Sequence, residues 1–182
     1  MSTSQSLRKV IAISGSIRAN STNLNYIKAI IELSKNKFDV DIFDGLTELP
    51  HFNPDLDTAS PPQKIIDFRA KLQAYDGILI CTPEYAMGVP GTLKNAIDWT
   101  VSSMEFSEKP VALITASSVG QKGHASLLET LKIIEAKITE ETQLLIPHAK
   151  TKISKDNKIT NKETLLEITS LINVFTVLLE KK

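Results

Sequence analysis

Residues 10–31 read VIAISGSIRANSTNLNYIKAII, and this stretch says most about the fold. The apolar run at 10–13 predicts a buried strand, and the apolar residues at 24, 27, 30 and 31 recur at helical spacing. Between strand and helix lies a polar loop, residues 15–23, that contains several hydroxyl side chains and one arginine. Such a strand, loop and helix form the first unit of an α/β protein.

The loop at 15–23 is suited to an anion. The start of a helix offers unpaired N–H groups and the positive end of the helix dipole. Ser16, Ser21, Thr22 and Asn23 add neutral donors, and Arg18 adds a planar, permanently charged fork that matches phosphate. The same residues would also suit a loop that only caps the helix, with Ser21 or Thr22 as N-cap. The loop by itself does not separate a phosphate site from a simple cap.

Outward from this loop, apolar runs alternate with helical patterns to the end of the chain. This alternation predicts a doubly wound α/β fold, in which a five-stranded parallel sheet has helices on both faces. We expect residues 1–182 to form one domain. The Pro-, Asp- and Asn-rich stretch at 44–61 is expected to be a surface loop. The expected strands are 9–14, 38–43, 77–81, 111–115 and 143–146, and the expected helices are 22–35, 62–74, 90–102, 123–138 and 162–179.

Composition and charge exclude several classes of protein. Lys and Arg together number 21, as do Asp and Glu, so the net charge is zero, which argues against nucleic acid or an anionic membrane as the main partner. Cys81 is the only cysteine, which excludes an intrachain disulfide. It ends an apolar strand and is expected to be a buried small hydrophobe. The apolar run after Arg8 is too short for a signal peptide, and we expect a cytoplasmic protein.

Two further loops follow the third and fourth expected strands. They read TPEYAMGVPG at 82–91 and ASSVGQKGH at 116–124. Each could be an ordinary strand-to-helix turn, for which Gly, Pro and Ser are the usual residues. In doubly wound sheets, however, ligands bind beyond the carboxyl ends of the strands, where these loops and the 15–23 loop would meet. Together the three loops predict a flat cofactor that carries a phosphate.

Two segments carry a resemblance to a known family. GSIRANSTN at 15–23, and PEY at 83–85 followed by VPGTLKNAIDW at 89–99, resemble the signatures of the NADPH-dependent FMN reductase family. That family also includes quinone, azo-dye and chromate reductases. The resemblance implies a flavodoxin-like fold, bound FMN, and a homodimer or homotetramer with the flavin near the subunit interface. It covers residues 8–150 in order and spacing.

The resemblance also implies which residues bind the cofactor. The FMN phosphate would lie among Ser16, Arg18, Ser21 and Asn23, with Thr22 beside them at the helix start. The isoalloxazine ring would lie against Pro83, Glu84 and Tyr85, largely through their backbone groups. The backbone N–H groups of residues 83–88, which include Ala86, Met87 and Gly88, are expected to be the donors to its pyrimidine edge. Ser118 and Gly120 would approach the ring from the other side. The chain departs from the family at Ala86, where Asn is common, and at His124, where a second glycine is common.

The predicted function is that of an NAD(P)H-dependent oxidoreductase. A hydride would pass from NADPH or NADH to bound FMN, and then to a free flavin, a quinone or a similar acceptor, with ping-pong kinetics. The flavin would carry the chemistry, so we assign no catalytic side chain. The alternatives are a flavodoxin-like electron carrier and a flavin-binding module without turnover. The sequence does not choose between NADPH and NADH or identify the acceptor.

The remaining candidates receive structural interpretations. His51, His124 and His148 show no ligand spacing, so no metal site is assigned. Of the three, only His124 is near the expected pocket, where it could contact a substrate or serve a surface or helix-start role. Lys94 and Asp98 are expected to pair on a helix surface. The lysine-rich stretch at 150–162 is interpreted as a solvated loop.

Overall fold

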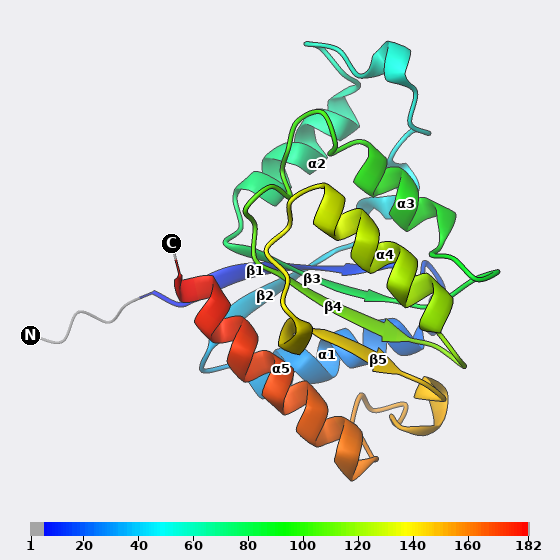
Figure 1. Ribbon diagram of the computed structural model, residues 1–182, viewed down its shortest axis with the longest axis vertical. Coiled ribbons are helices and arrows are strands. Elements are labelled where there is room, and N and C mark those ends of the chain that lie inside the picture. The colour runs from blue at the N-terminus through cyan, green and yellow to red at the C-terminus, as the bar shows by residue number, and fades with distance from the viewer. Residues whose placement is uncertain (1–5, 182) are drawn as a thin grey trace, which may run out of the picture.

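The computed structural model describes residues 6–181, and within this range five parallel strands form one sheet in the order β2-β1-β3-β4-β5 (Figure 1). This is the flavodoxin-like order, which confirms the predicted fold class. The strands are β1 (Arg8–Ser14), β2 (Phe38–Phe43), β3 (Gly77–Thr82), β4 (Val111–Ala116) and β5 (Gln143–Ile146). Every expected strand is found to within one residue at each end.

Helices cover both faces of the sheet. α1 (Thr22–Ser34) and α5 (Lys162–Glu180) lie on one face, and α2 (Gln63–Gln73), α3 (Gly91–Asp98) and α4 (Gln121–Ile133) lie on the other (Figure 1). The sheet therefore has a hydrophobic core on each face, and successive residues of β1 belong to opposite cores. Val10 and Ala12 pack toward α1 and α5, and Ile11 and Ile13 pack toward α2 and α3. Because both faces are covered, β3 and β4 are buried along their whole length.

Two helices end earlier than the sequence predicts. α3 ends at Asp98 rather than at 102, because the carbonyl of Trp99 accepts a hydrogen bond from Arg69 Nε of α2 at 2.8 Å and the chain then turns. α4 runs from Gln121 to Ile133 rather than over 123–138, because Glu135 adopts a positive φ of 61°. Lys137 then bridges to Pro110 beside β4. Both ends are set by contacts with distant segments that sequence periodicity does not register.

The segment at 44–61 is more ordered than a simple surface loop. It contains the short 3-10 helices η1 (Gly45–Glu48) and η2 (Pro54–Leu56), and it buries Leu46 and Leu49. Further short 3-10 helices are η3 (Glu140–Thr142) and η4 (Ala149–Thr151).

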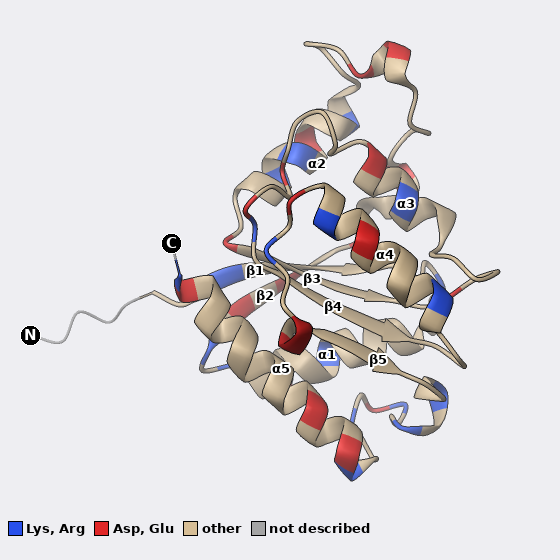
Figure 2. Cartoon of the chain, in the orientation of Figure 1, with Lys and Arg blue, Asp and Glu red and all other residues tan. Residues whose placement is uncertain are grey.

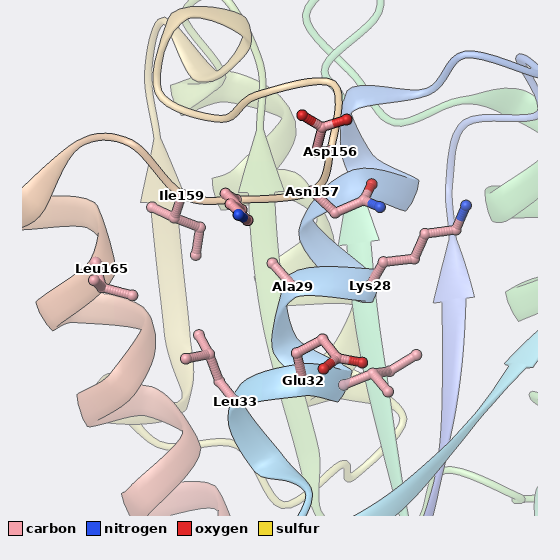
Figure 3. A pocket seen from close by; sticks show the side chains of 10 residues that line it. Lys28, Ala29, Glu32, Leu33, Asp156, Asn157, Ile159 and Leu165 are labelled. Atoms are coloured by element: carbon pink, nitrogen blue, oxygen red, sulfur yellow. The ribbon is translucent and has the colours of Figure 1, made fainter.

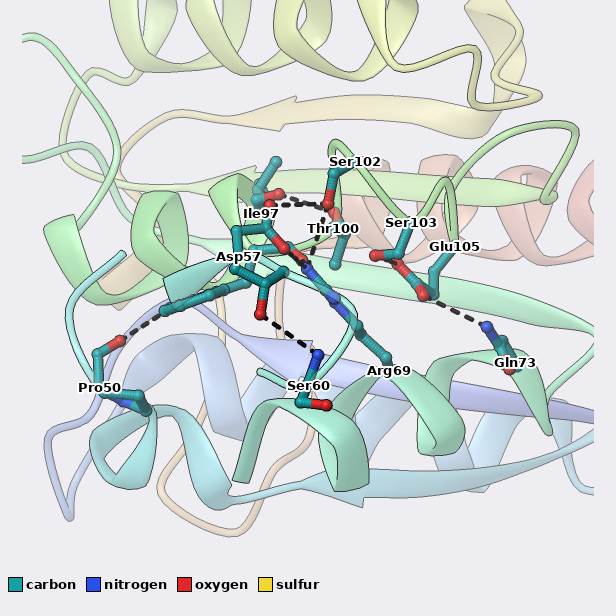
Figure 4. Close-up of polar contacts among 12 residues, drawn as sticks. Pro50, Asp57, Ser60, Arg69, Gln73, Ile97, Thr100, Ser102, Ser103 and Glu105 are labelled. Carbon is teal, nitrogen blue, oxygen red and sulfur yellow. Dashed lines mark hydrogen bonds and ion pairs between the residues drawn. The ribbon is translucent and has the colours of Figure 1, made fainter. Parts of the chain in front are cut away.

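Arg69 anchors the 44–61 segment to the body of the protein (Figure 4). Its guanidinium pairs with Asp57 at 2.7 Å, and the two side chains are only 11% and 10% exposed. Ser102 Oγ donates to the second carboxylate oxygen of Asp57 at 2.7 Å. The indole of Trp99 adds a second contact to this segment, because its Nε1 donates to the carbonyl of Pro50 at 2.8 Å. A largely enclosed ion pair and a buried indole therefore hold this long connection in place.

Several smaller expectations are also tested. Cys81 is fully buried, as expected, and burial raises the pKa of its thiol well above the usual range. Lys94 and Asp98 form the expected ion pair. Across residues 6–181, no helix is both long enough and apolar enough to cross a membrane.

Candidate functional site

A cavity of about 540 Å³ opens at the carboxyl ends of β1, β3 and β4. Parallel strands end at the same sheet edge, so loops far apart in sequence converge here. All three loops singled out in the sequence contribute, and a fourth segment after β5 closes the cavity. The lining residues are Ser16, Arg18, Ser21, Thr22, Asn23, Pro83, Glu84, Tyr85, Ala116, Ser117, Ser118, His148, Ala149, Lys150 and Thr151.

The first loop is held by close packing of its backbone onto β3. Gly15 N donates to the carbonyl of Cys81 at 2.9 Å. A Cβ on Gly15 would lie 2.2 Å from Thr82 Oγ1, so only glycine fits this approach. The hydroxyl of Ser21 caps α1 by accepting from Leu24 N at 3.3 Å. The N–H groups of Thr22 and Asn23 stand ahead of the first intrahelical bond and face no backbone partner in that helix.

Arg18 lies at the rim of the cavity as an available cation. Its side chain makes no ion pair within residues 6–181, and it is exposed. Asn23, by contrast, is almost fully buried, and its side-chain oxygen accepts from Cys81 Sγ at 3.3 Å. Asn23 therefore shapes the floor of the loop, while Arg18 and the first N–H groups of α1 are free to meet an anion.

The second loop makes a tight two-residue turn. Tyr85 and Gly88 exchange two backbone hydrogen bonds of 2.9 Å, and the residues between them, Ala86 and Met87, have φ of 48° and 62°. Positive φ at both central positions is the type I′ pattern, which favours Asn and Gly. Tyr85 lines the cavity, whereas Ala86, Met87 and Gly88 lie outside the lining, and Met87 is 75% exposed.

Replacing Ala86 by glycine is expected to stabilise the protein by about 1 kcal/mol, because alanine in the left-handed region is strained and glycine is not. Chemical denaturation at equilibrium measures the free energy of unfolding. Ala125→Gly is the matched control: Ala125 is exposed within α4, so the same change there should destabilise by about 1 kcal/mol. A loss of stability in Ala86→Gly would contradict the strain assigned to this turn.

Most N–H groups of the second loop are already used, which corrects the expectation that residues 83–88 offer a row of donors to a ring. Pro83 has no N–H, Glu84 N donates to Ser117 Oγ at 3.2 Å, and Tyr85 and Gly88 bond to each other. Within residues 6–181, the N–H groups of Ala86 and Met87 alone in this set lack a protein acceptor. This loop therefore offers fewer free N–H donors than the sequence suggests.

Glu84 ties the second loop to the third. Its carboxylate accepts from Gly123 N, in the first turn of α4, at 2.6 Å, where the helix dipole favours negative charge. A Cβ on Gly123 would lie 2.9 Å from the carbonyl of Gly88. Gly120 is the N-cap of α4, and its φ of 101° requires glycine. It shapes the third loop but does not line the cavity, whereas Ser118 does.

Residues 148–151 form a fourth wall of the cavity, and the sequence did not identify them as site residues. His148 adopts a φ of 51°, and the next residues form η4. The N–H groups of His148 and Ala149 donate to the carbonyls of Ser118 and Ser117 at 3.1 and 3.0 Å. Tyr26 of α1 donates to the carbonyl of Ala149 at 3.0 Å. The position of this segment directly after the last parallel strand is the signal that could have identified it.

His124 is a structural residue rather than a cavity residue. Its Nδ1 lies 2.9 Å from Thr115 Oγ1 and its Nε2 lies 3.0 Å from Gln143 Oε1, so it joins β4 to β5. It does not line the cavity. The side chain at this position, where the family commonly has a second glycine, therefore does not enter the cavity.

The burial of His124 gives the protein a pH-dependent stability. Burial lowers the pKa of His124, and the hydrogen bond to Gln143 Oε1 offsets this only in part. The unfolded chain therefore binds a proton more readily, so stability falls as the pH drops below about 6.5. We expect His124→Gln to reduce the loss of stability between pH 7 and pH 5, as measured by thermal unfolding. His51→Gln, a change at an exposed position, should keep the wild-type loss; equal losses in all three proteins would refute the assignment.

Comparisons with known proteins agree with this arrangement. A sequence profile for the family described as NADPH-dependent FMN reductase matches residues 8–151. An NAD(P)H-dependent FMN reductase from Pseudomonas aeruginosa is 33% identical over 147 residues, covering 78% of each chain. A 2-hydroxy-1,4-benzoquinone reductase from a Burkholderia species is 29% identical over 163 residues, covering 86% of this chain and 87% of the relative.

A solved structure extends the comparison to the fold. The flavoenzyme NAD(P)H:acceptor oxidoreductase FerB from Paracoccus denitrificans superposes with a TM-score of 0.83 at 22% identity. The superposition covers 96% of this chain and 98% of that one. The two chains thus share their fold over nearly their whole length, and the family match covers the segment that contains the three loops.

Proposed function

This chain belongs to the NADPH-dependent FMN reductase family, and from that membership we propose that it is an FMN-dependent NAD(P)H oxidoreductase that reduces quinones, free flavins or similar acceptors. The observation that carries the proposal is the meeting, in one cavity of about 540 Å³, of a half-exposed Tyr85 with Arg18 and the first N–H groups of α1, which have no ion-pair or hydrogen-bond partner among the residues that the structure describes. Nine of the residues expected to bind the flavin line that cavity: Ser16, Arg18, Ser21, Thr22, Asn23, Pro83, Glu84, Tyr85 and Ser118.

The donors present in the cavity fit the phosphate of FMN. Arg18 and the N–H groups of Thr22 and Asn23 would hold the phosphate at the start of α1. The one carboxylate in the lining belongs to Glu84, and its bond to Gly123 N keeps it engaged away from that anion. The cavity volume is within the range of cofactor sites.

The flavin plane would lie between the second loop and the third. Pro83 and Tyr85 border it on one side, and Ser118 approaches from the other. The N–H groups of Ala86 and Met87 follow Tyr85 outside the lining and have no acceptor within residues 6–181, so they would be the donors to a polar edge that extends past Tyr85. When bound, FMN supplies the hydride acceptor and donor chemistry. The residues of the chain bind and orient the flavin, and the nucleotide and the acceptor use the same opening in turn, which gives ping-pong kinetics.

We further propose a homodimer or homotetramer whose interface lies beside the mouth of the cavity and leaves the opening accessible. Apolar side chains are exposed around that mouth on each loop: Ile17 is 58% exposed, Tyr85 48%, Met87 75% and Val119 52%. Grouped exposed apolar residues of this kind are typical of an interface. A cytoplasmic location and a single FMN-binding domain over residues 1–182 complete the proposal. The lone, buried Cys81 and the continuous sheet support these two points.

An anaerobic absorption spectrum tests the function. We expect the protein reconstituted with FMN to lose its flavin absorption on addition of NADPH or NADH and to regain it on addition of a quinone. Flavin that stays oxidised in the presence of both nucleotides would favour an electron carrier or a binding module. Failure to bind FMN would remove the proposal altogether.

A further inference from the structure

A second hollow of about 610 Å³ adjoins the flavin cavity on the side of the phosphate loop. The two share Arg18, Thr22 and Lys150, so they meet where the FMN phosphate is proposed to bind. The other residues that line the hollow come from α1, from the loop before it and from the segment after η4. They are Ala19, Asn20, Leu24, Asn25, Lys28, Ile153, Ser154, Lys155 and Asn157.

The hollow carries positive charge without a compensating carboxylate. Arg18, Lys28, Lys150 and Lys155 line it, and none of the residues described as lining it is Asp or Glu. None of the four cations makes an ion pair within residues 6–181. Figure 2 shows the blue segments on the loop that follows β5. Because like charges held together repel each other, an anion in this hollow would be favoured.

Acidic residues line adjoining hollows, and one of these contains Asp44 and shares Arg18, Ala19, Leu24 and Lys28 with the positive hollow. Glu32 and Asp156 line a separate hollow of about 670 Å³ between α1, the 156–159 segment and α5 (Figure 3). Figure 3 shows Lys28 extending away from Ile159 and Leu165, the apolar side of that groove. The positive hollow therefore differs in charge from its neighbour, although Lys28 and Asn157 border both.

The neutral lining suits a nucleotide rather than a bare anion. Asn20, Asn25 and Asn157 provide amide groups that can both donate and accept, as a ribose and a base require. Leu24 and Ile153 provide apolar surface for a base. The volume is within the range of small-molecule sites, so an adenosine monophosphate group can be accommodated.

We propose that this hollow binds the adenylate half of a flavin dinucleotide, so that the protein takes FAD as well as FMN. The inference rests on the proposed flavin site. Arg18, Thr22 and Lys150 would contact the phosphate next to the flavin, and a group linked beyond that phosphate would enter the hollow directly. Lys28 and Lys155, which line the hollow but not the flavin cavity, would contact the second phosphate.

Calorimetric titration of the flavin-free protein with FMN, FAD and ADP tests this proposal. We expect FAD to bind within about 10-fold of FMN, and the double variant Lys28→Gln/Lys155→Gln to weaken FAD binding by about 10-fold or more. The same variant should change FMN binding by less than about 3-fold. The control Lys152→Gln/Lys162→Gln removes the same charge from residues outside both cavities and should leave both affinities unchanged.

Several results would overturn the proposal. Binding of FMN together with an FAD affinity more than about 100-fold weaker would reject the adenylate site and leave the proposed function intact. Equal losses for FMN and FAD in Lys28→Gln/Lys155→Gln would show that the lysines act only on the shared phosphate. Binding of ADP to the FMN-loaded protein, with FAD excluded, would assign the hollow to a separate nucleotide. Binding of neither flavin would reject both this proposal and the proposed function.

Discussion

Arg18→Ala is expected to weaken FMN binding by about 10- to 100-fold, because hydrogen bonds from a guanidinium to a phosphate contribute about 1.5–3 kcal/mol. Arg18 is exposed and makes no ion pair within residues 6–181, so the substitution should leave the fold unchanged. Quenching of flavin fluorescence on titration of the flavin-free protein measures the affinity.

Two controls make the Arg18 result specific. Riboflavin has no phosphate, so its affinity should be nearly the same in Arg18→Ala and in the wild type. Arg18→Lys keeps the charge without the planar fork, so its affinity for FMN should lie between that of Arg18→Ala and that of the wild type. An FMN affinity that is unchanged in a folded Arg18→Ala variant would show that the phosphate binds elsewhere.

Asp57→Ala is expected to reduce the free energy of unfolding by about 2–3 kcal/mol, because it removes a charged hydrogen bond between side chains that are only 11% and 10% exposed and leaves the guanidinium of Arg69 without its carboxylate. Arg69 keeps its bond to the carbonyl of Trp99, which does not neutralise the charge. Equilibrium unfolding in urea, followed by circular dichroism, measures the loss.

The neighbouring Asp55 provides a matched control for Asp57. Asp55 lies in the short helix η2, of which Asp57 is the C-cap, and it is exposed, so Asp55→Ala should cost less than about 0.5 kcal/mol. The fluorescence of Trp99, the only tryptophan, reports whether the 44–61 segment has detached. A loss below about 1 kcal/mol with Trp99 fluorescence unchanged would mean that the ion pair is not needed to hold the segment.

The fold could be predicted from the sequence because burial on both faces leaves an unmistakable pattern. β3 and β4 are apolar along nearly their whole length, and this pattern does not depend on any distant residue. The helix ends could not be predicted in the same way. The end of α3 depends on Arg69, which lies 30 residues earlier in the chain, and that contact leaves no periodic signal.

The site was predictable to a similar extent and for similar reasons. The phosphate loop depends on local chemistry at the start of α1, so Ser16, Arg18 and Ser21 could be identified directly. The wall at 148–151 could not be identified from its residue types. Lys150 resembles any solvated lysine, and it is exposed as expected, but only the parallel pairing of β5 with β4 brings it to the cavity.

The position of residues 148–151 couples cofactor binding to the folding of the C-terminal part of the chain. β5 is a four-residue strand at the edge of the sheet, and the segment that closes the cavity follows it. The loop after β4 is tied to this edge strand, because Ser117 N donates to the carbonyl of Ile146 at 3.2 Å, so the cavity is complete only when β5 is paired. A ligand that binds the complete cavity therefore stabilises the pairing of β5 by mass action. Cofactor binding therefore requires β5 to be paired with β4. Bound cofactor in turn protects the C-terminal quarter of the chain from local unfolding.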